Sequence, residues 1–286
     1  MTAPAFCFDK VGDWSVLKLD IIERYGKAYT KAFNNRGRKL KKYYIDGFSG
    51  AGVHVQKTTG QQVEGSPARA LKVYPAFDGF YFIDLNKDKA AYLKNQCKDR
   101  SDVHIINDDA NTYLRDLLPT IKFNLFNRAL CVLDPYGLHL DWDIIELAGK
   151  SRAVDMFLNF PVMDMNRNAI WRSPDKVPQE GIDRMNRFWG DESWRKIAYA
   201  KSKQENLFSS PDDEKQPNRA IVEAFLKRLR EVAGFKYVPE PMPMTNSRKA
   251  VVYYLFFASE KAVASNIIDS IFGNVRRGVS REGRGP

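Results

Sequence analysis

Four short apolar runs in the first half of the chain each end in polar or glycine residues, and this series constrains the fold most. The runs are Tyr43–Gly52 (YYIDGFSGAG), Phe80–Asp88 (FYFIDLNKD), His104–Asn111 (HIINDDAN) and Cys131–Leu138 (CVLDPYGL). Continuous apolar runs of this kind are typical of strands in a parallel sheet, with ligand-binding loops at their carboxyl ends. Helical spacing between runs, as in Lys87–Lys98, predicts βαβ crossovers. The series therefore predicts an α/β fold.

Later apolar runs extend the predicted sheet to seven strands. Asp155–Phe160, Phe235–Val238 and Ala250–Ala258 have the composition of strands. The periodicity of Trp14–Phe33 and Ala220–Val232 predicts amphipathic helices. The expected architecture is a mostly parallel sheet that is completed by a hairpin and covered by helices.

Composition divides the chain into four parts. Residues 1–161 carry the motifs, and residues 162–219 are polar and predict a helical insert or cap. Residues 220–275 are expected to complete the same domain as the first part. Residues 276–286 form a basic tail with the composition of a disordered segment.

The chain is basic, with 45 Lys and Arg against 35 Asp and Glu and a formal net charge of +10. Basic residues gather in Asn34–Lys42, in the insert and in the tail. In the insert, Trp171, Trp189 and Trp194 lie among arginines, so they either stack on bases or form a small core. This charge favours an anionic partner, and nucleic acid (DNA or RNA) is the partner expected.

Other features limit where the protein acts. No run approaches the roughly 18 apolar residues of a membrane span, and the sequence MTAPAFCFDKVGDW lacks the pattern of a secretory signal. Cys7, Cys97 and Cys131 have no metal-ligand spacing. The sequence therefore predicts a cytoplasmic protein with no membrane association and no metal site.

The loop after the first run is the first candidate ligand site. Glycine allows the backbone to approach a ligand closely and to adopt positive φ. The candidate cofactor-binding residues here are Asp46, Gly47, Ser49, Gly50 and Gly52. The alternative is a glycine-rich turn without a ligand. Val53–Gly65 then intervenes before Ser66 and Pro67 begin a helix, and we expect it to form a flap over a cofactor or a substrate loop.

Acidic residues follow the second and third runs. A carboxylate at Asp84 can accept hydrogen bonds from both hydroxyls of a ribose. Asp108, or failing it Asp109, is the candidate partner of an adenine amino group. The alternative role at both places is to cap the following helix, by Asp84 or Asn86 in one case and by Asp108 or Asp109 in the other.

Asp134, Pro135 and Tyr136, after the fourth run, are the candidate catalytic residues. The Asp134 carboxylate and the Pro135 carbonyl can accept the two hydrogens of an exocyclic amine. Tyr136 can stack on a base extruded from its helix or loop. The alternative is a tight turn, since proline followed two residues later by a glycine, here Gly137, is common in turns.

In this order the motifs resemble those of class I S-adenosylmethionine-dependent methyltransferases, whose Rossmann-like sheet ends in an antiparallel last strand. The resemblance implies that the Asp46–Gly52 loop holds the methionine part and ribose of the cofactor S-adenosylmethionine. Asp134-Pro135-Tyr136-Gly137 is similar to the Asp-Pro-Pro-Tyr site of adenine-N6 methyltransferases but lacks the second proline. It looks closer to the Asp-Pro-Phe-Gly site of tRNA guanine-N2 methyltransferases. The implied activity is methylation of an exocyclic amine of a nucleic-acid base.

The chain also resembles the three-Cys-motif partner family, TcmP. This resemblance covers about Trp14–Pro161 and rests on the tryptophan-containing first helix, YIDGFSGAG, EGSP at Glu64–Pro67, FID at Phe82–Asp84 and LDPYG at Leu133–Gly137. It implies a partner whose three-cysteine motif holds an iron–sulfur cluster of the radical S-adenosylmethionine type. Since this chain lacks such a motif, any cluster belongs to the partner. The alternative function is therefore a non-catalytic or partner-dependent methyltransferase-like module.

Overall fold

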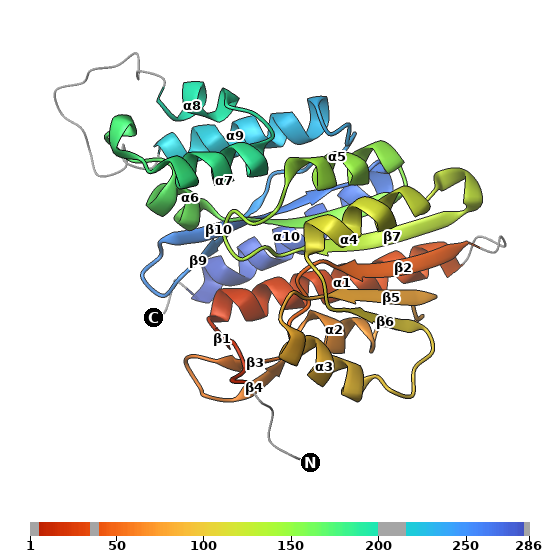
Figure 1. Ribbon diagram of the computed structural model, residues 1–286. Helices are drawn as coiled ribbons and strands as arrows, with labels where there is room; N and C mark the ends of the chain where they lie inside the picture. Colours follow the sequence, from red (N-terminus) through yellow and green to blue (C-terminus); the bar gives the residue numbers. More distant parts are fainter. Residues whose placement is uncertain (1–5, 35–39, 200–215, 283–286) are drawn as a thin grey trace.

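The computed structural model describes residues 6–34, 40–199 and 216–282. Seven strands form its main sheet: β2 (Lys41–Asp46), β5 (Gly79–Ile83), β6 (Val103–Ile106), β7 (Asn127–Leu133), β8 (Val154–Phe160), β9 (Met242–Thr245) and β10 (Val251–Ala258). Their order is β6-β5-β2-β7-β8-β10-β9 (Figure 1). β10 pairs antiparallel with β8 and β9, and the other neighbours are parallel. This confirms the predicted α/β fold class.

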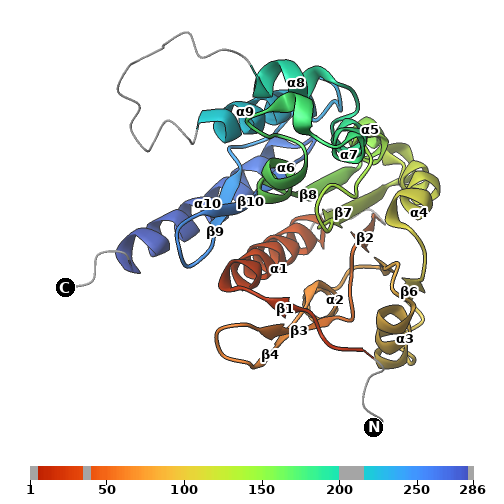
Figure 2. The same ribbon diagram turned by 60° about the vertical axis from the view of Figure 1, so that its left-hand side comes forward.

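Helices cover both faces of the sheet (Figures 1 and 2). One face packs against α1 (Asp13–Asn34), α2 (Ser66–Ala70), α3 (Lys87–Gln96) and α10 (Ala262–Glu282). The other packs against α4 (Ala110–Leu117), α5 (Trp142–Ser151), α6 (Val162–Asn168), α7 (Gln179–Trp189), α8 (Ser193–Ala198) and α9 (Gln216–Glu231). Successive side chains of a strand point to opposite faces of the sheet, so each face has its own hydrophobic core. Tyr44 belongs to the first core, under α1 and α10, and Ile45 belongs to the second core, under α4 and α5.

The segment Val53–Gly65 forms a hairpin of β3 (Val53–Gln56) and β4 (Gln62–Glu64). β3 also pairs with the short strand β1 (Lys10–Val11), so a second sheet of three strands lies beside the amino end of α1 (Figure 2). Pairing of β3 with β4 satisfies the backbone hydrogen-bonding groups of this segment, which in the sequence is visible only as an insertion flanked by glycines. Its turn includes Gly60 at a φ of +69°.

The strand predicted at Phe235–Val238 is wrong. Only an isolated bridge between Tyr237 and Ser259 is present there, and the edge strand is β9. Pro241 and Pro243 argue against a strand in the sequence. An edge strand tolerates proline, however, because one side of its backbone needs no ladder hydrogen bonds.

The predicted disordered tail is also largely wrong, since α10 continues to Glu282. Phe272 and Val275 are buried on the first core and extend the packing toward the end of the helix. The basic residues Arg36, Arg38, Lys39 and Arg284 lie outside the described residues.

Two of the three tryptophans of residues 162–219 belong to the core and do not stack on bases. Trp189 and Trp194 are each 1% exposed and join the second core. The Trp189 indole donates to the Ser193 hydroxyl at 2.9 Å, and the Trp194 indole donates to the Asn186 side chain at 2.8 Å. Within the described ranges, no helix is long and apolar enough to cross a membrane.

Candidate functional site

The predicted site residues lie at the carboxyl ends of adjacent strands of the sheet. Asp46 ends β2 in register with Val132 of β7, so Asp134 emerges beside it. β5 lies on the other side of β2 and is followed by Asp84, and β6 comes next and is followed by Asp108. Parallel pairing therefore brings together acids that are far apart in sequence.

Hydrogen bonds to β5 hold the glycine loop. The Ser49 amide and hydroxyl both donate to the Ile83 carbonyl, at 2.9 and 3.1 Å, and Ser49 is buried. Gly50 and Gly52 have φ values of +61° and +76°. A Cβ on Gly47 would lie 3.1 Å from the Leu133 side chain. Ser49 thus anchors the loop. Close packing explains why residue 47 is a glycine, and positive φ explains why residues 50 and 52 are glycines.

The Asp84 carboxylate supports the same loop. Its Oδ2 accepts from the Gly50 amide at 2.7 Å and its Oδ1 from the Asn86 amide at 2.8 Å. Asn86, and not Asp84, is the N-cap of α3. A carboxylate offers about four acceptor positions, so Asp84 keeps capacity for ribose hydroxyls. The Asn107 side chain donates to the carbonyls of Asp84 and Leu85, both at 3.0 Å, and joins this loop to the end of β6.

The two acids after β6 have different surroundings. Asp109 is the N-cap of α4, where its Oδ1 accepts from the Thr112 amide at 3.0 Å. Asp108 is exposed and accepts a hydrogen bond from the Asp109 amide at 2.8 Å. Asp109 therefore has the capping role, and Asp108 is the acid with a side chain open to solvent.

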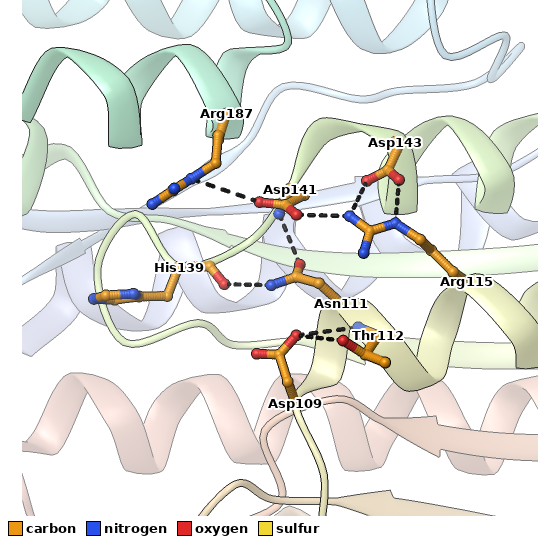
Figure 3. Close-up of polar contacts among 8 residues, drawn as sticks. All are labelled: Asp109, Asn111, Thr112, Arg115, His139, Asp141, Asp143 and Arg187. Atoms are coloured by element: carbon orange, nitrogen blue, oxygen red, sulfur yellow. Dashed lines mark hydrogen bonds and ion pairs between the residues drawn. The ribbon is translucent and has the colours of Figure 1, made fainter. Parts of the chain in front are cut away.

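Asn111 fixes the loop after β7 to α4 (Figure 3). Its side chain donates to the His139 carbonyl at 3.1 Å and accepts from the Asp141 amide at 2.8 Å. Arg115, one turn further along α4, bridges the carboxylates of Asp141 and Asp143. These contacts hold the loop that begins with Asp134.

Asp46 is fully buried and incompletely hydrogen bonded. Its Oδ1 accepts from the Phe48 amide at 3.1 Å, whereas its Oδ2 has no partner among the described residues. Burial raises the pKa of Asp46 to about 7, although the nearby Ser66 hydroxyl and the Phe48 amide lower it. A buried acceptor without a partner is costly, and a cationic donor would relieve that cost.

Lys18 of α1 forms an ion pair with Asp134. Burial alone would lower the pKa of Lys18, but the Asp134 carboxylate raises it above its ordinary value. The Lys18 ammonium also lies 5.2 Å from the centre of the Tyr253 ring on β10. Lys18 contacts Oδ2 of Asp134, and Oδ1 has no partner among the described residues.

The residues after Asp134 are held differently from one another. Pro135 is buried, whereas Tyr136 is 91% exposed. Gly137 has a φ of +68°, and Asp164 of α6 accepts from the Leu138 amide at 3.1 Å. A fixed turn therefore presents the Tyr136 ring to solvent.

These residues fit S-adenosylmethionine. The unpartnered Asp46 Oδ2 suits the ammonium group of its methionine part, and the carboxylate of Asp84 suits ribose hydroxyls. The open side chain of Asp108 suits the adenine amino group. The fit depends on groups from three neighbouring strands.

Sequence reasoning missed two residues that hold the site: Lys18 and Asp164. Lys18 had a signal, because it lies four residues from both Trp14 and Ile22 and so falls on the apolar stripe of its helix. Asp164 had none, since its position depends on α6.

Comparisons with known proteins show the fold. No family model and no curated protein matches the chain, so the three-Cys-motif partner family is not confirmed. Protein LPL1258 from Legionella pneumophila, a DUF519 protein, is similar in structure with a TM-score of 0.52 and 12% identity, over 90% of this chain and 91% of that one.

Several other similar structures are S-adenosylmethionine-dependent methyltransferases. One, from Agrobacterium tumefaciens, has a TM-score of 0.38 and 9% identity over 88% of this chain and 64% of that one. The plantazolicin methyltransferase BamL, solved with S-adenosylhomocysteine, has a TM-score of 0.38 and 12% identity over 86% of each chain. The chain shares its α/β fold with the DUF519 protein.

Proposed function

We propose that this protein is an S-adenosylmethionine-dependent methyltransferase that acts on an exocyclic amine of a nucleic-acid base. The observation that carries the proposal is the pair formed by Lys18 and Asp134, one strand away from the buried Asp46, whose Oδ2 has no hydrogen-bond partner among the described residues. The exposed ring of Tyr136 follows two residues later.

The chemistry assigned to this site needs positioning more than acid–base help. Bound S-adenosylmethionine would supply an electrophilic methyl group on a sulfonium. Lys18 holds Oδ2 of Asp134, which leaves Oδ1 to accept one hydrogen of the amine. The Pro135 carbonyl accepts the other, and the Tyr136 ring stacks on the base.

The net charge of +10 supports nucleic acid as the substrate. α6, which touches the Tyr136 loop through Asp164, adds the exposed residues Asn166 and Arg167. An arginine on the helix that contacts the Tyr136 loop suits a phosphate near a stacked base.

Transfer of labelled methyl from S-adenosylmethionine to tRNA, other RNA or DNA tests the proposal. The diagnostic variant is Asp134→Asn, because an amide oxygen can still face Lys18 while the carboxylate is lost. We expect a methylated base in the nuclease digest from the wild-type reaction, and a rate at least about a hundredfold lower for Asp134→Asn.

A fully active Asp134→Asn enzyme would refute the assigned site. Transfer to protein or small molecules, with none to nucleic acid, would refute the substrate class. Transfer that appears only when an iron–sulfur partner is added would instead favour the partner-dependent module.

A further inference from the structure

A cavity of about 490 Å³ lies at the amino ends of β7 and β8, whereas Asp134 follows the carboxyl end of β7 (Figure 1). Its lining comes from the turn before β7, from the end of α5 with the turn into β8, and from the junction of β10 and α10. β7 has seven residues, so about 20 Å separates its two ends. The cavity is therefore distinct from the candidate cofactor site, and its volume is that of a small-molecule site.

Cations outnumber anions in the lining of this cavity. The charged residues that line it are Lys122, Lys150, Arg152, Glu260 and Lys261. Lys150 forms an ion pair at 2.5 Å with Glu146, which does not line the cavity. Lys122 and Lys261 are exposed, and neither forms an ion pair with another described residue. Two ammonium groups of the cavity thus lack a counter-charge.

Glu260 does not neutralise these ammonium groups, because two other cations already share its carboxylate. Lys236 pairs with it at 2.8 Å and Arg152 at 3.0 Å. Burial raises the pKa of Glu260, but the hydrogen bonds from Lys236 and Arg152 lower it below its ordinary value. The carboxylate is therefore ionised and fully occupied, and the excess positive charge of the cavity suits an anion.

Arg128 fixes the apolar wall that Phe123 forms. The Arg128 guanidinium lies 3.7 Å from the centre of the Phe123 ring and donates to the carbonyls of Phe123 and Asn127, at 3.2 and 2.6 Å. The ring is still 43% exposed, and the Lys261 ammonium lies 4.7 Å from its centre. An aromatic ring and an ammonium group without an ion pair thus lie next to each other in a site that is already formed.

The remaining lining indicates a ligand larger than a phosphate ion. Ile121 and Leu147 add apolar surface to that of Phe123. Sites of this kind, mostly apolar with a few placed charges, bind organic molecules that carry a charged group. The cavity therefore suits an anionic group attached to a flat apolar group.

We propose that this cavity binds a nucleoside monophosphate, with Lys122 and Lys261 as the partners of its phosphate and Phe123 as the wall for its base. A phosphate monoester carries close to two negative charges at neutral pH, which match the two ammonium groups. A nucleic-acid base presents an aromatic face that packs on an exposed aromatic ring. The inference does not depend on the proposed function, because this cavity lies at the other ends of the strands and needs no S-adenosylmethionine.

Calorimetric titration with the four ribonucleoside 5′-monophosphates and the four matching nucleosides tests the proposal. Excess S-adenosylhomocysteine is present throughout, so that a nucleotide does not enter the candidate cofactor site. We expect at least one monophosphate to bind, and its nucleoside to bind at least about tenfold more weakly. Inorganic phosphate should also bind at least about tenfold more weakly than the monophosphate, since it lacks the base.

Lys261→Gln and Lys122→Gln should each weaken monophosphate binding by about tenfold, as for the loss of a hydrogen bond to a charged group. Binding of the nucleoside should not change in either variant. Lys94→Gln is the matched control, because Lys94 is an exposed lysine of α3 and does not line the cavity. It should bind the monophosphate as the wild type does. Thermal melting of each variant identifies an unfolded protein before titration.

Several outcomes would overturn the inference. One is a wild-type protein that binds none of the monophosphates, and another is equal affinity for a monophosphate and its nucleoside. Binding that is lost in Asp84→Ala but kept in both lysine variants would assign the nucleotide to the candidate cofactor site. An oligonucleotide without a terminal phosphate that binds as tightly through the same lysines would assign the cavity to a nucleic-acid strand.

The failure of this inference and that of the proposed function are distinguishable. Binding of a monophosphate that depends on Lys122 and Lys261, without methyl transfer to any nucleic acid, would support the cavity assignment and count against the proposed function. Methyl transfer by a protein that binds no monophosphate would do the reverse.

Discussion

Lys18 and Asp134 form an ion pair across 116 residues of sequence, and the lysine is the more buried partner. The Lys18 side chain is 8% exposed, against 33% for Asp134. Removal of the carboxylate leaves a buried ammonium without a partner, whereas removal of the ammonium leaves a carboxylate that water can reach. The two single variants are therefore not equivalent.

Asp134→Ala should destabilise the protein by about 3 kcal/mol, and Lys18→Met by clearly less. Urea denaturation of both variants measures the difference. The double variant Lys18→Met/Asp134→Leu should recover stability relative to Asp134→Ala. Equal losses in the two single variants would show that the burial difference has no energetic effect. Asp134→Asn is for this reason the better test of activity.

Asp46 should make the folded protein less stable as pH rises. Its pKa is about 7 in the folded state, against an ordinary value of 3.8. Between these values the folded state binds more protons than the unfolded state, so the free energy of unfolding falls, by at most about 1.4 kcal/mol per pH unit. Urea denaturation at several pH values between about 4 and 7 should show that the free energy of unfolding depends less on pH in Asp46→Asn than in the wild type. An unchanged slope would contradict the assignment.

Asp84→Ala should weaken both S-adenosylhomocysteine and 5′-methylthioadenosine, by about tenfold or more. The carboxylate holds the Gly50 amide at 2.7 Å and is the candidate ribose ligand, and both ligands contain the ribose. Calorimetry checks this, with Asp88→Ala as the control because Asp88 is exposed on the next helix. Normal binding of 5′-methylthioadenosine by Asp84→Ala would exclude the ribose role.

Tyr136→Ala should leave stability within about 0.5 kcal/mol of the wild type, because the ring is 91% exposed. Affinity for single-stranded nucleic acid should fall by about 1–3 kcal/mol if the ring stacks on a base. Fluorescence anisotropy with labelled oligonucleotides measures this. Leu125→Ala, a 60% exposed residue before the start of β7, is the control. Equal affinities for all three proteins would rule out stacking.

Gly149→Ala should destabilise the fold by about 1–3 kcal/mol. An added Cβ in α5 would lie 2.0 Å from the Ala233 carbonyl oxygen, and backbone cannot move aside as a side chain can. Gly273→Ala in α10 is the matched control, since its Cβ would lie 3.6 Å from the Arg277 side chain. That variant should be about 0.5–1 kcal/mol more stable than wild type. Thermal and urea denaturation compare the two.

The central strands could be predicted because their signal is local. Tyr43–Asp46 and Asp155–Phe160 are continuous apolar runs, and the structure places β2 and β8 on them. The strand β9 could not be predicted, because tolerance of Pro243 depends on its place at the sheet edge. The helical tail depends on packing of Val275 against the core, which no pattern in the tail reveals.

The acids of the candidate site could be located for the same reason, since each lies at the end of a strand or within two residues after it. Their different surroundings could not. The division of roles between Asp108 and Asp109 follows from the start of α4. Lys18 stands between these cases, because its place on the apolar stripe is visible in the sequence but its partner is not.

The ion pair between Lys18 and Asp134 also bears on how the chain assembles during synthesis. α1 leaves the ribosome well before β7, and its docking face carries a lysine whose counter-charge has not yet been made. Burial of that charge without a partner is unfavourable. Stable docking of the first helix therefore waits for the strand that ends next to Asp134, so the helix and the carboxyl ends of the central strands become native together.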